Sequence, residues 1–372
     1  MNLLILGASA RAAAGSARRI GLHPTCLDLF GDADLPCSSP PIRVDPSDYP
    51  DGLARLAEAL PPMPWLYTGA IENRPDLVDR VSARHRLLGN DGATLRAVRD
   101  PLALGLAARD AGVEFPNVRL DPAGLPVDGS WLRKPLASGG GRGIRPWRGV
   151  GVERRGECYF QERATGLPLS VLFVGQGSTA LCLGITRQFV GKGGNRFAYR
   201  GSLAPWPVDR DTLARVVRLG DALATRHGLR GLFGVDLVLG QGHAWPIEVN
   251  PRYTASVEVL EWALGRSLLA EHLGAWGMSV DGPSHPPSPA PFMAKAILFA
   301  SQPTVWQSGD PWFGDDPWAF PEIADVPHPG TRFHPGEPIL SVFAGGDSPR
   351  ACRKALGTRL VAWRGKLRSM RA

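Results

Sequence analysis

The chain has 372 residues, a length that usually corresponds to two or three domains. Apolar residues make up 44% of it and charged residues 21%, which excludes an intrinsically disordered protein. No apolar run reaches the ~18 residues of a membrane span. Five scattered cysteines, with no export signal before them, indicate a reducing cytoplasm. We therefore expect a cytoplasmic globular protein without a membrane partner.

The net charge of +7 is spread along the chain, and its one local excess lies in the final segment RGKLRSMRA. A charged chain end of this kind is more typical of a solvated terminus than of a nucleic-acid surface, so we expect no nucleic-acid partner. Only five of the 42 basic residues are lysines. Where arginine serves as the ordinary surface cation, a retained lysine is a candidate for a specific role as a compact ammonium group.

The first third of the chain has the pattern of a parallel α/β sheet. Residues 2–7 predict a buried strand, and a small-residue helix and a second strand follow before a Pro-rich loop at 36–50. A helix is expected at 51–60, and residues 74–112 are mostly helical, with Pro101 as the first residue of a new helix. The turn after the first strand lacks the spaced glycines of a dinucleotide site, which favours a structural role for this unit.

From residue 115 the pattern changes to short strands that alternate with Gly-rich turns. One clear helix is expected at 211–228, and another at 255–273 follows a pair of apolar strands. A Pro/Ser-rich stretch at 279–291 predicts a linker before a small β-rich unit that ends in a helix near 349–364. The predicted domains are residues 1–94, 95–278 and 279–372.

A lysine and a glycine loop form the first candidate site. A predicted strand that begins at Trp131 ends in Lys134, and four of the five residues at 139–143 are glycine. Backbone N–H groups of such a loop can surround anionic oxygens, and the lysine adds a positive charge beside them. The lysine precedes the glycines, so the pattern is not the common P-loop, and a flexible surface loop fits it equally well. The candidate phosphate-binding residues are Lys134, Ser138, Gly139, Gly140, Gly141 and Gly143.

Two apolar strands at 234–250 predict a β-hairpin in which Asp236, Glu248 and Asn250 interrupt the apolar pattern. Glu248 and Asn250 share a face because side chains alternate along a strand. A three-residue turn at 240–242 brings Asp236 to that face, whereas a two-residue turn does so only with a bulge. Converging carboxylates need a cation, and hard oxygen ligands suit Mg²⁺. The alternative is a set of solvent-facing carboxylates on a one-sided sheet.

A third segment ends a predicted strand in polar residues at Gln161, Glu162 and Ala164. Such a strand end can offer donors and acceptors to a planar base, although an ordinary strand end has the same pattern. A later Gly-rich stretch carries Arg187, Lys192 and Arg200. It fits a substrate-side loop or a solvated loop equally well.

In chain order, the lysine with its glycine loop, the polar strand end and the Asp…Glu-x-Asn-Pro-Arg segment together resemble the ATP-grasp superfamily. The resemblance spans about 95–275. It implies an α/β and α+β fold: a pre-ATP-grasp Rossmann-like domain, a two-subdomain ATP-grasp fold and a small β-rich C-terminal domain. The segments GASARAAAGSARR, DLFGDADL and EVNPRYTASVE together resemble a branch of ATP-dependent carboligases related to biotin carboxylase.

The resemblance also implies roles for the candidate residues. Lys134 and Arg252 would be the catalytic residues, with Lys134 on the nucleotide phosphates and Arg252 on an acyl phosphate or the acceptor carboxylate. The glycine loop would be a mobile lid, the polar strand end would hold adenine, and the three oxygen ligands of the hairpin would hold Mg²⁺, or Mn²⁺ in its place. The chain departs from many relatives at Arg99, where they have a lysine, and at Gly166–Ser170, where they have an acid for the ribose.

The function implied is an ATP- and Mg²⁺-dependent ligase that joins a small-molecule carboxylic acid to an amine, or to a thiol, through an acyl phosphate. The branch is associated with one-carbon coenzyme metabolism, which names no substrate. Two alternatives stay open: a carboxylase of the same fold that uses carboxyphosphate, and a nucleotide-binding regulatory protein with a degenerate site. The acid, the acceptor and the formation of a homodimer are left open by the sequence.

Overall fold

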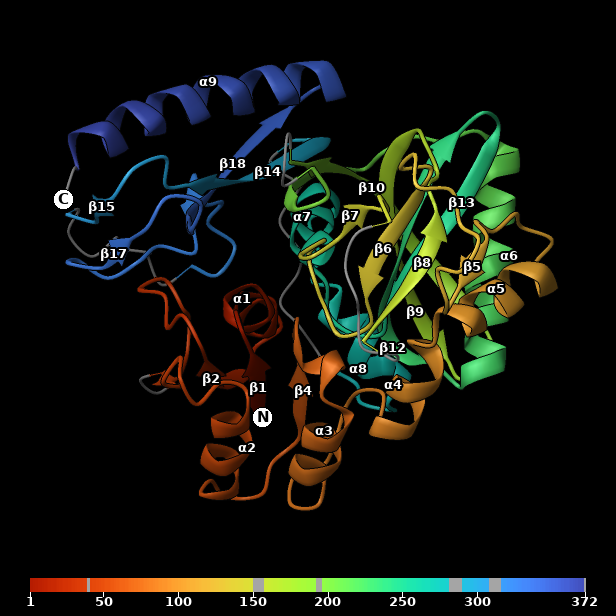
Figure 1. Cartoon of the computed structure of the whole chain (residues 1–372). Helices are drawn as coiled ribbons and strands as arrows, with labels where there is room; N and C mark the ends of the chain where they lie inside the picture. Colours follow the sequence, from red (N-terminus) through yellow and green to blue (C-terminus); the bar gives the residue numbers. More distant parts are fainter. Residues whose placement is uncertain (39–40, 150–156, 192–195, 281–289, 308–315, 371–372) are drawn as a thin grey trace.

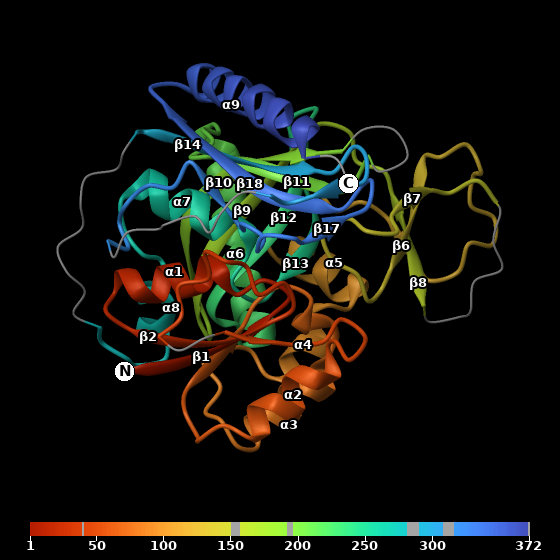
Figure 2. The same ribbon diagram turned by 90° about the vertical axis from the view of Figure 1, so that its left-hand side faces the viewer.

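The computed structural model describes residues 1–38, 41–149, 157–191, 196–280, 290–307 and 316–370. Within these residues the chain forms an N-terminal parallel sheet, a long antiparallel sheet and a small antiparallel sheet that stands out as a lobe (Figure 1, Figure 2). A short ribbon of β15 (Thr304–Val305) and β17 (Arg332–Phe333) lies in the C-terminal part. This mixed architecture agrees with the predicted fold class. None of the described helices is long and apolar enough to cross a membrane.

The N-terminal sheet consists of four strands with helices on both faces. Its elements are β1 (Asn2–Gly7), α1 (Arg11–Arg19), β2 (His23–Asp28), β3 (Ile42–Arg43), α2 (Asp51–Glu58), β4 (Trp65–Tyr67), the 3₁₀ turn η1 (Ile71–Asn73), α3 (Pro75–Ser82) and α4 (Gly92–Val98). The strand order is β3-β2-β1-β4, all parallel. Leu3 and Ile5 pack with α1, whereas Leu4 and Leu6 pack with α2 and α3. The strand order reverses beside β1, and sheets of this kind bind ligands at the carboxyl ends of the strands there.

The lobe is the small sheet drawn in yellow, which projects from the body of the molecule in Figure 2. Its strands are β5 (Val118–Arg119), β6 (Trp131–Pro135), β7 (Arg145–Pro146) and β8 (Cys158–Glu162), in the order β5-β8-β6-β7. Trp147 and Phe160 form its small core with an edge-to-face ring contact, 4.9 Å between centroids. The lobe therefore has a hydrophobic core of its own. Its strands β6 and β8 lie beside the long sheet, where residues of β6, β8 and β13 line a common pocket.

The long sheet is the centre of the molecule. Its strands are β9 (Leu167–Gln176), β10 (Ala180–Val190), β11 (Tyr199–Ala204), β12 (Arg230–Gly240), β13 (His243–Asn250), β14 (Phe292–Phe299), β16 (Ile323–Ala324) and β18 (Pro338–Gly346). They follow the order β13-β12-β9-β10-β11-β14-β18-β16. The helices α5 (Pro101–Asp110), α6 (Arg210–His227) and α9 (Pro349–Ser369) cover one face, and α7 (Ala255–Leu264) and α8 (Leu269–Ala275) cover the other. The second face also packs against α1 of the N-terminal sheet.

The C-terminal segment extends the long sheet, because β14 pairs with β11 and β18 pairs with β14. The predicted boundary at residue 279 therefore falls inside a unit that shares one sheet, and the domain limits stay predictions. Most of the predicted linker, residues 281–289, lies outside the described residues. The final helix is longer than expected and lies across β14 and β18 (Figure 1).

Two predicted elements differ in the structure. The helix expected at 255–273 is two helices, because Gly265 ends α7 with a left-handed backbone, φ 63°. The Gly-rich stretch expected as a loop contains strand residues: Arg187 lies on β10 and Arg200 on β11. Lys192 lies outside the described residues.

Candidate active site

The β12–β13 hairpin places the predicted metal-binding residues together. Gly240 pairs with His243, so the turn has two residues, Gln241 and Gly242, with φ values of 52° and 78°. Left-handed residues fit this turn because their twist matches that of the flanking strands. Of the two turns that the sequence left open, the structure therefore has the two-residue one. A bulge next to Asp236 restores the shared face, and the strand register shifts by one residue there.

Asp236 lies directly opposite Glu248 in the hairpin, and Asn250 lies two residues farther along. Gln188 Nε2 donates to Asp236 Oδ1 at 3.0 Å, and Asn250 Nδ2 donates to Asp236 Oδ2 at 3.4 Å. Burial, together with the charge of Glu248, raises the pKa of Asp236 to about 6. Two facing carboxylates of this kind are destabilising unless a cation lies between them.

Arg252 follows this hairpin and contacts the N-terminal sheet. Its Nη2 donates to Glu72 Oε1 at 2.6 Å and to Asn250 Oδ1 at 3.2 Å. Arg252 Nε and Glu72 Oε2 are buried and have no hydrogen-bond partner among the described residues. One donor of the arginine and one acceptor of the carboxylate are therefore unused within the described residues.

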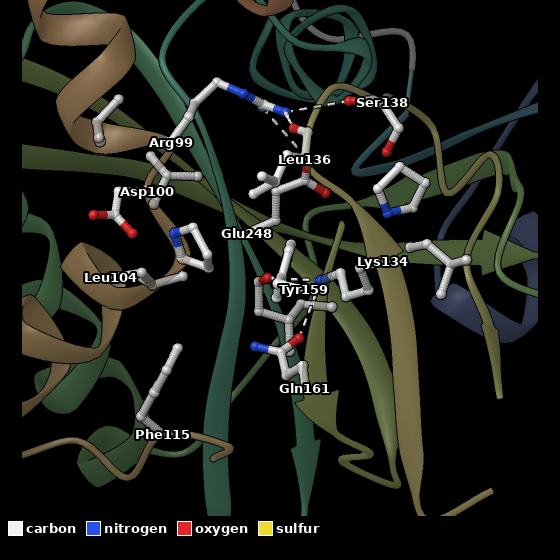
Figure 3. A pocket seen from close by; sticks show the side chains of 16 residues that line it. Arg99, Asp100, Leu104, Phe115, Lys134, Leu136, Ser138, Tyr159, Gln161 and Glu248 are labelled. Carbon is white, nitrogen blue, oxygen red and sulfur yellow. Dashed lines mark hydrogen bonds and ion pairs between the residues drawn. The ribbon is translucent and has the colours of Figure 1, made fainter. Parts of the chain in front are cut away.

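A pocket opens between the lobe and the long sheet (Figure 3). Lys134, at the end of β6, projects into it and is only 5% exposed. Its Nζ donates to Gln161 Oε1 and to the carbonyl oxygen of Ile247, both at 3.0 Å. Ile247 is the bulged residue of β13 and pairs with no residue of β12. Both acceptors are neutral, so the lysine charge is not balanced by a carboxylate hydrogen bond and suits an anionic ligand.

Arg99 lines the same pocket. Its Nη1 lies 3.5 Å from Glu248 Oε1, and its Nη2 donates to Asn73 Oδ1 at 2.9 Å. The same Nη2 reaches the carbonyl oxygens of Ser138 at 3.2 Å and Leu136 at 3.4 Å. The guanidinium group thus connects the metal-site carboxylate with the start of the glycine loop.

The glycine loop needs its glycines for backbone conformation. Gly140, Gly141 and Gly143 have φ values of 61°, 75° and 78°, a region that other residues rarely adopt. A Cβ on Gly141 would lie 1.9 Å from the carbonyl oxygen of Phe197, and Tyr199 N–H donates to Gly140 O at 3.0 Å. The loop therefore packs against the connection between β10 and β11.

The polar strand end contributes one side chain to the pocket. Gln161 lines it beside Lys134. Glu162 is exposed, and its Oε2 accepts a hydrogen bond from Asn117 Nδ2 at 2.7 Å. Ala164 is not a lining residue.

The structure thus divides the predicted residues into two groups. Those that line the pocket are Lys134, Ser138, Gln161 and Glu248. Those outside its lining are Gly139, Gly140, Gly141, Gly143, Glu162, Ala164, Asp236, Asn250 and Arg252. Asp236 and Asn250 still adjoin Glu248 through the hairpin. Among the described residues there is no group of three or more His, Cys, Asp or Glu side chains that could hold a metal; the predicted set has two carboxylates and an amide.

Glu72 and Asn73 are site residues that the sequence did not single out. They lie in a short turn far from the recognisable segments, and no spacing links them to the arginines that they contact. The structure brings them to the site because the carboxyl end of β4 faces the β12–β13 hairpin.

Residues 99–256 match the model of the ATP-grasp domain family. The fold is similar to the biotin carboxylase domain of 2-oxoglutarate carboxylase from Hydrogenobacter thermophilus, a dimer solved with MgADP, ADP and bicarbonate. The TM-score is 0.70 at 14% identity, over 93% of this chain and 86% of that one. No curated protein sequence matches the chain.

A ligase and a synthetase also have similar folds. Phosphoribosylamine–glycine ligase from Thermotoga maritima matches with a TM-score of 0.65 at 16% identity, over 100% of this chain and 97% of that one. N5-carboxyaminoimidazole ribonucleotide synthetase from Thermus thermophilus matches with a TM-score of 0.64 at 18% identity, over 97% and 98%. Identities of this size establish a shared fold and leave the substrate open.

Proposed function

Because the chain belongs to the ATP-grasp superfamily, we propose that it is an ATP- and Mg²⁺-dependent ligase that activates a small-molecule carboxylic acid as an acyl phosphate and transfers the acyl group to an amine. The observation that supports this most directly is the pocket between the lobe and the long sheet, where Lys134 and Arg99 lie beside Glu248. Two cationic side chains next to Glu248, a carboxylate that faces Asp236, suit the binding of a polyphosphate together with its Mg²⁺.

The pocket has an apolar part and a charged part, as a nucleotide requires. Leu104, Phe115 and Tyr159 offer apolar surface for a base, and Gln161 offers an amide next to it. Lys134 uses two of its Nζ donors on neutral oxygens, which leaves the third donor for a phosphate oxygen. The glycine loop would then close over the phosphates and exclude water, which an acyl phosphate requires.

The donor set of the hairpin fits a small divalent cation. Asp236, Glu248 and Asn250 would hold Mg²⁺, which bound there would neutralise phosphate charge. Mn²⁺ is compatible with the same oxygen ligands. Arg252 would bind the carboxylate of the acid or the phosphoryl oxygens, because its buried Nε has no partner among the described residues.

The proposed reaction needs no covalent enzyme intermediate. A carboxylate oxygen of the acid attacks the γ-phosphorus of ATP, and ADP leaves. The amine nitrogen then attacks the acyl carbon, loses a proton and expels inorganic phosphate. The protein contributes position and electrostatic stabilisation through Lys134, Arg99 and Arg252. A thiol acceptor would follow the same route, and a homodimer is compatible with the proposal.

The test is a phosphate-release assay with Mg-ATP over paired pools of carboxylic acids and amines, with acids of one-carbon coenzyme metabolism among them. We expect release that needs both an acid and an amine. Release that needs bicarbonate and no amine would support the carboxyphosphate alternative. Nucleotide binding without acceptor-dependent turnover across the pools would contradict the ligase and favour a regulatory protein.

Lys134→Arg tests the placement of the phosphates in the same assay. A guanidinium group is larger and planar, so we expect it to misplace the phosphates and to lower Mg-ATP affinity at least tenfold. Lys354→Arg, on the exposed part of α9, is the matched control and should behave as wild type. Equal behaviour of the two variants would mean that the phosphates bind elsewhere.

A further inference from the structure

The turn η1 places two consecutive side chains on the two arginines of the site. It follows β4 at the carboxyl end of the N-terminal sheet, and Glu72 and Asn73 are its last two residues. Glu72 contacts Arg252, and Asn73 contacts Arg99. A single short turn of the N-terminal sheet therefore reaches both guanidinium groups.

Glu72 holds Arg252 in a fixed direction. Its side chain is fully buried, and its Oε1 accepts from Arg252 Nη2 at 2.6 Å. The same nitrogen donates to Asn250 Oδ1 at 3.2 Å, so the carboxylate aligns Arg252 with a predicted metal ligand. Burial alone would raise the pKa of Glu72, but the charge of Arg252 holds that pKa below its usual value. Glu72 is therefore an anion in this pair.

Asn73 holds Arg99 in the wall of the pocket. Its Oδ1 accepts from Arg99 Nη2 at 2.9 Å, shorter than the contacts of the same nitrogen with the carbonyl oxygens of Ser138 and Leu136. Arg99 Nη1 is then 3.5 Å from Glu248 Oε1. Without the Asn73 oxygen, Arg99 would keep only longer contacts and would be free to leave this orientation.

The backbone around the turn is itself held in place. Asn73 N–H donates to Ala70 O at 3.2 Å, and Arg74 N–H donates to Ile71 O at 2.8 Å. Ala70 has a φ of 80°, which is uncommon for a residue with a side chain. A Cβ on Gly69 would lie 3.5 Å from the guanidinium carbon of Arg252. The turn is thus close-packed against the arginine that it orients.

We propose that Glu72 and Asn73 are positioning residues that set the two halves of the site separately: Asn73 prepares Arg99 for the nucleotide phosphates, and Glu72 prepares Arg252 for the acyl group. The inference rests on the proposed function. If it holds, the N-terminal sheet contributes directly to the active site. Substitutions at the adjacent residues Glu72 and Asn73 would then affect different steps, acyl transfer and nucleotide binding respectively.

The experiment measures Mg-ADP affinity by calorimetry, kcat and KM by phosphate release, and the melting temperature of the nucleotide-free protein. We expect Asn73→Ala to weaken Mg-ADP binding and to raise the KM for ATP about tenfold. Glu72→Gln should leave Mg-ADP affinity within about twofold of wild type and lower kcat at least tenfold. The matched control is Arg74→Gln, because Arg74 is the next residue in the chain but forms ion pairs with Asp51 and Asp76, away from the site. This substitution should leave Mg-ADP affinity, kcat and KM unchanged.

A double-mutant cycle shows whether Asn73 acts through Arg99. In an Arg99→Ala background, Asn73→Ala should cost little further affinity, because the side chain that it orients is gone. If Asn73→Ala lowers Mg-ADP affinity equally in the wild-type and the Arg99→Ala proteins, the inference is overturned. Mg-ADP affinity of the Asn73→Ala protein equal to that of the wild type would also overturn it. Absence of Mg-ADP binding by the wild type would instead refute the proposed function. If Glu72→Gln does not fold, the Asn73 variants decide alone.

Discussion

Two of the four lysines in the described part of the chain are buried, and their partners give them different roles. Lys134 is 5% exposed and donates to the neutral oxygens of Gln161 and Ile247. Lys295 is equally buried, but its Nζ lies 2.8 Å from Glu258 Oε2. The charge of Lys295 is already balanced within the protein, whereas that of Lys134 is available to a ligand. The difference depends on the nearest acceptors of each ammonium group and not on lysine as a residue type.

His272 shows how a single buried side chain makes stability depend on pH. Its Nδ1 accepts from Leu232 N–H at 2.8 Å, and its Nε2 therefore carries the proton and donates to Leu88 O at 2.9 Å. Burial lowers the pKa of His272 to about 4, from 6.5 in the unfolded chain. The unfolded chain therefore takes up the proton first as the pH falls, and stability declines from about pH 6.5 until the folded state also protonates near 4.

We expect this residue alone to remove about 3 kcal/mol of unfolding free energy between those two pH values. His272→Gln should lower the stability at pH 7, because one hydrogen-bond partner is lost, and should flatten the decline at acid pH. Urea denaturation at several pH values measures both effects. The exposed His334→Gln is the control. A decline that is equally steep in His272→Gln and wild type would contradict the assignment.

Scarcity of lysine in the sequence directed attention to Lys134, and the structure places it in the pocket. The same argument applies equally to Lys295, which has a structural partner, so composition could not separate the two. Glu72 and Asn73 carry no sequence signal, because an acid and an amide in a short turn are ordinary. Their importance comes from the approach of two segments about 180 residues apart, which a pattern along the chain does not contain.

At the scale of elements, the glycine loop offers a test of the lid, because Gly139 and Gly141 differ in the space available for a side chain. Gly141 has a φ of 75° and no room for a Cβ, whereas nothing lies within 4 Å of a Cβ on Gly139. Gly141→Ala should displace the loop from Phe197 and lower ATP turnover at least tenfold, because the lid no longer closes. Gly139→Ala should keep most of the activity. Hydrogen exchange of the loop with and without Mg-ADP checks the cause, and equal turnover in the two variants would refute a lid at this position.

The elements themselves were largely predictable, and the exceptions have local causes. Apolar alternation located β9, β10, β12 and β13, since each has a buried face and clear turn residues at its ends. The sequence could name the bulge in β13 only as an alternative, because it did not decide between a two-residue and a three-residue turn; in the structure, Lys134 donates to the carbonyl oxygen of the bulged residue, Ile247. Strand β11 was missed because it follows a Gly-rich stretch, contains Gly201, and has a partner, β14, that lies about 90 residues later.

At the scale of the molecule, the sheet that carries the site continues into the C-terminal segment. The sequence favoured a separate unit after a Pro/Ser stretch, since composition marks a boundary but does not show which edge a strand joins. Edge pairing between β11 and β14 is a long-range contact. A network of buried ion pairs connects α1 of the N-terminal unit, α7 and the C-terminal strands. Figure 1 shows α1 between the N-terminal sheet and α7.

Glu258 on α7 is the centre of this network. It pairs with Arg11 of α1 through Oε1 and with Lys295 of β14 through Oε2, and Arg11 Nε also lies 2.7 Å from Asp325 Oδ1. Burial opposes the charge of Glu258, but the two cations hold its pKa below the usual value. Glu258 therefore contacts a cation from each of the other two parts of the chain.

Glu258→Gln keeps the shape of the side chain and removes its charge, which leaves Lys295 without its ion-pair partner and Arg11 with only Asp325 and the more distant Asp34 as paired carboxylates among the described residues. Loss of one partner from a buried ion pair costs about 3–5 kcal/mol, and we expect a loss of that order in urea denaturation. The matched control is Glu58→Gln, whose pair with Arg80 is exposed on the N-terminal sheet and should have little effect. Because the network joins regions far apart in the chain, Glu258→Gln should also separate unfolding of the N-terminal sheet from that of the long sheet. A stable variant with a single unchanged transition would show that apolar packing of α1 on α7 and α8 is what holds the molecule together.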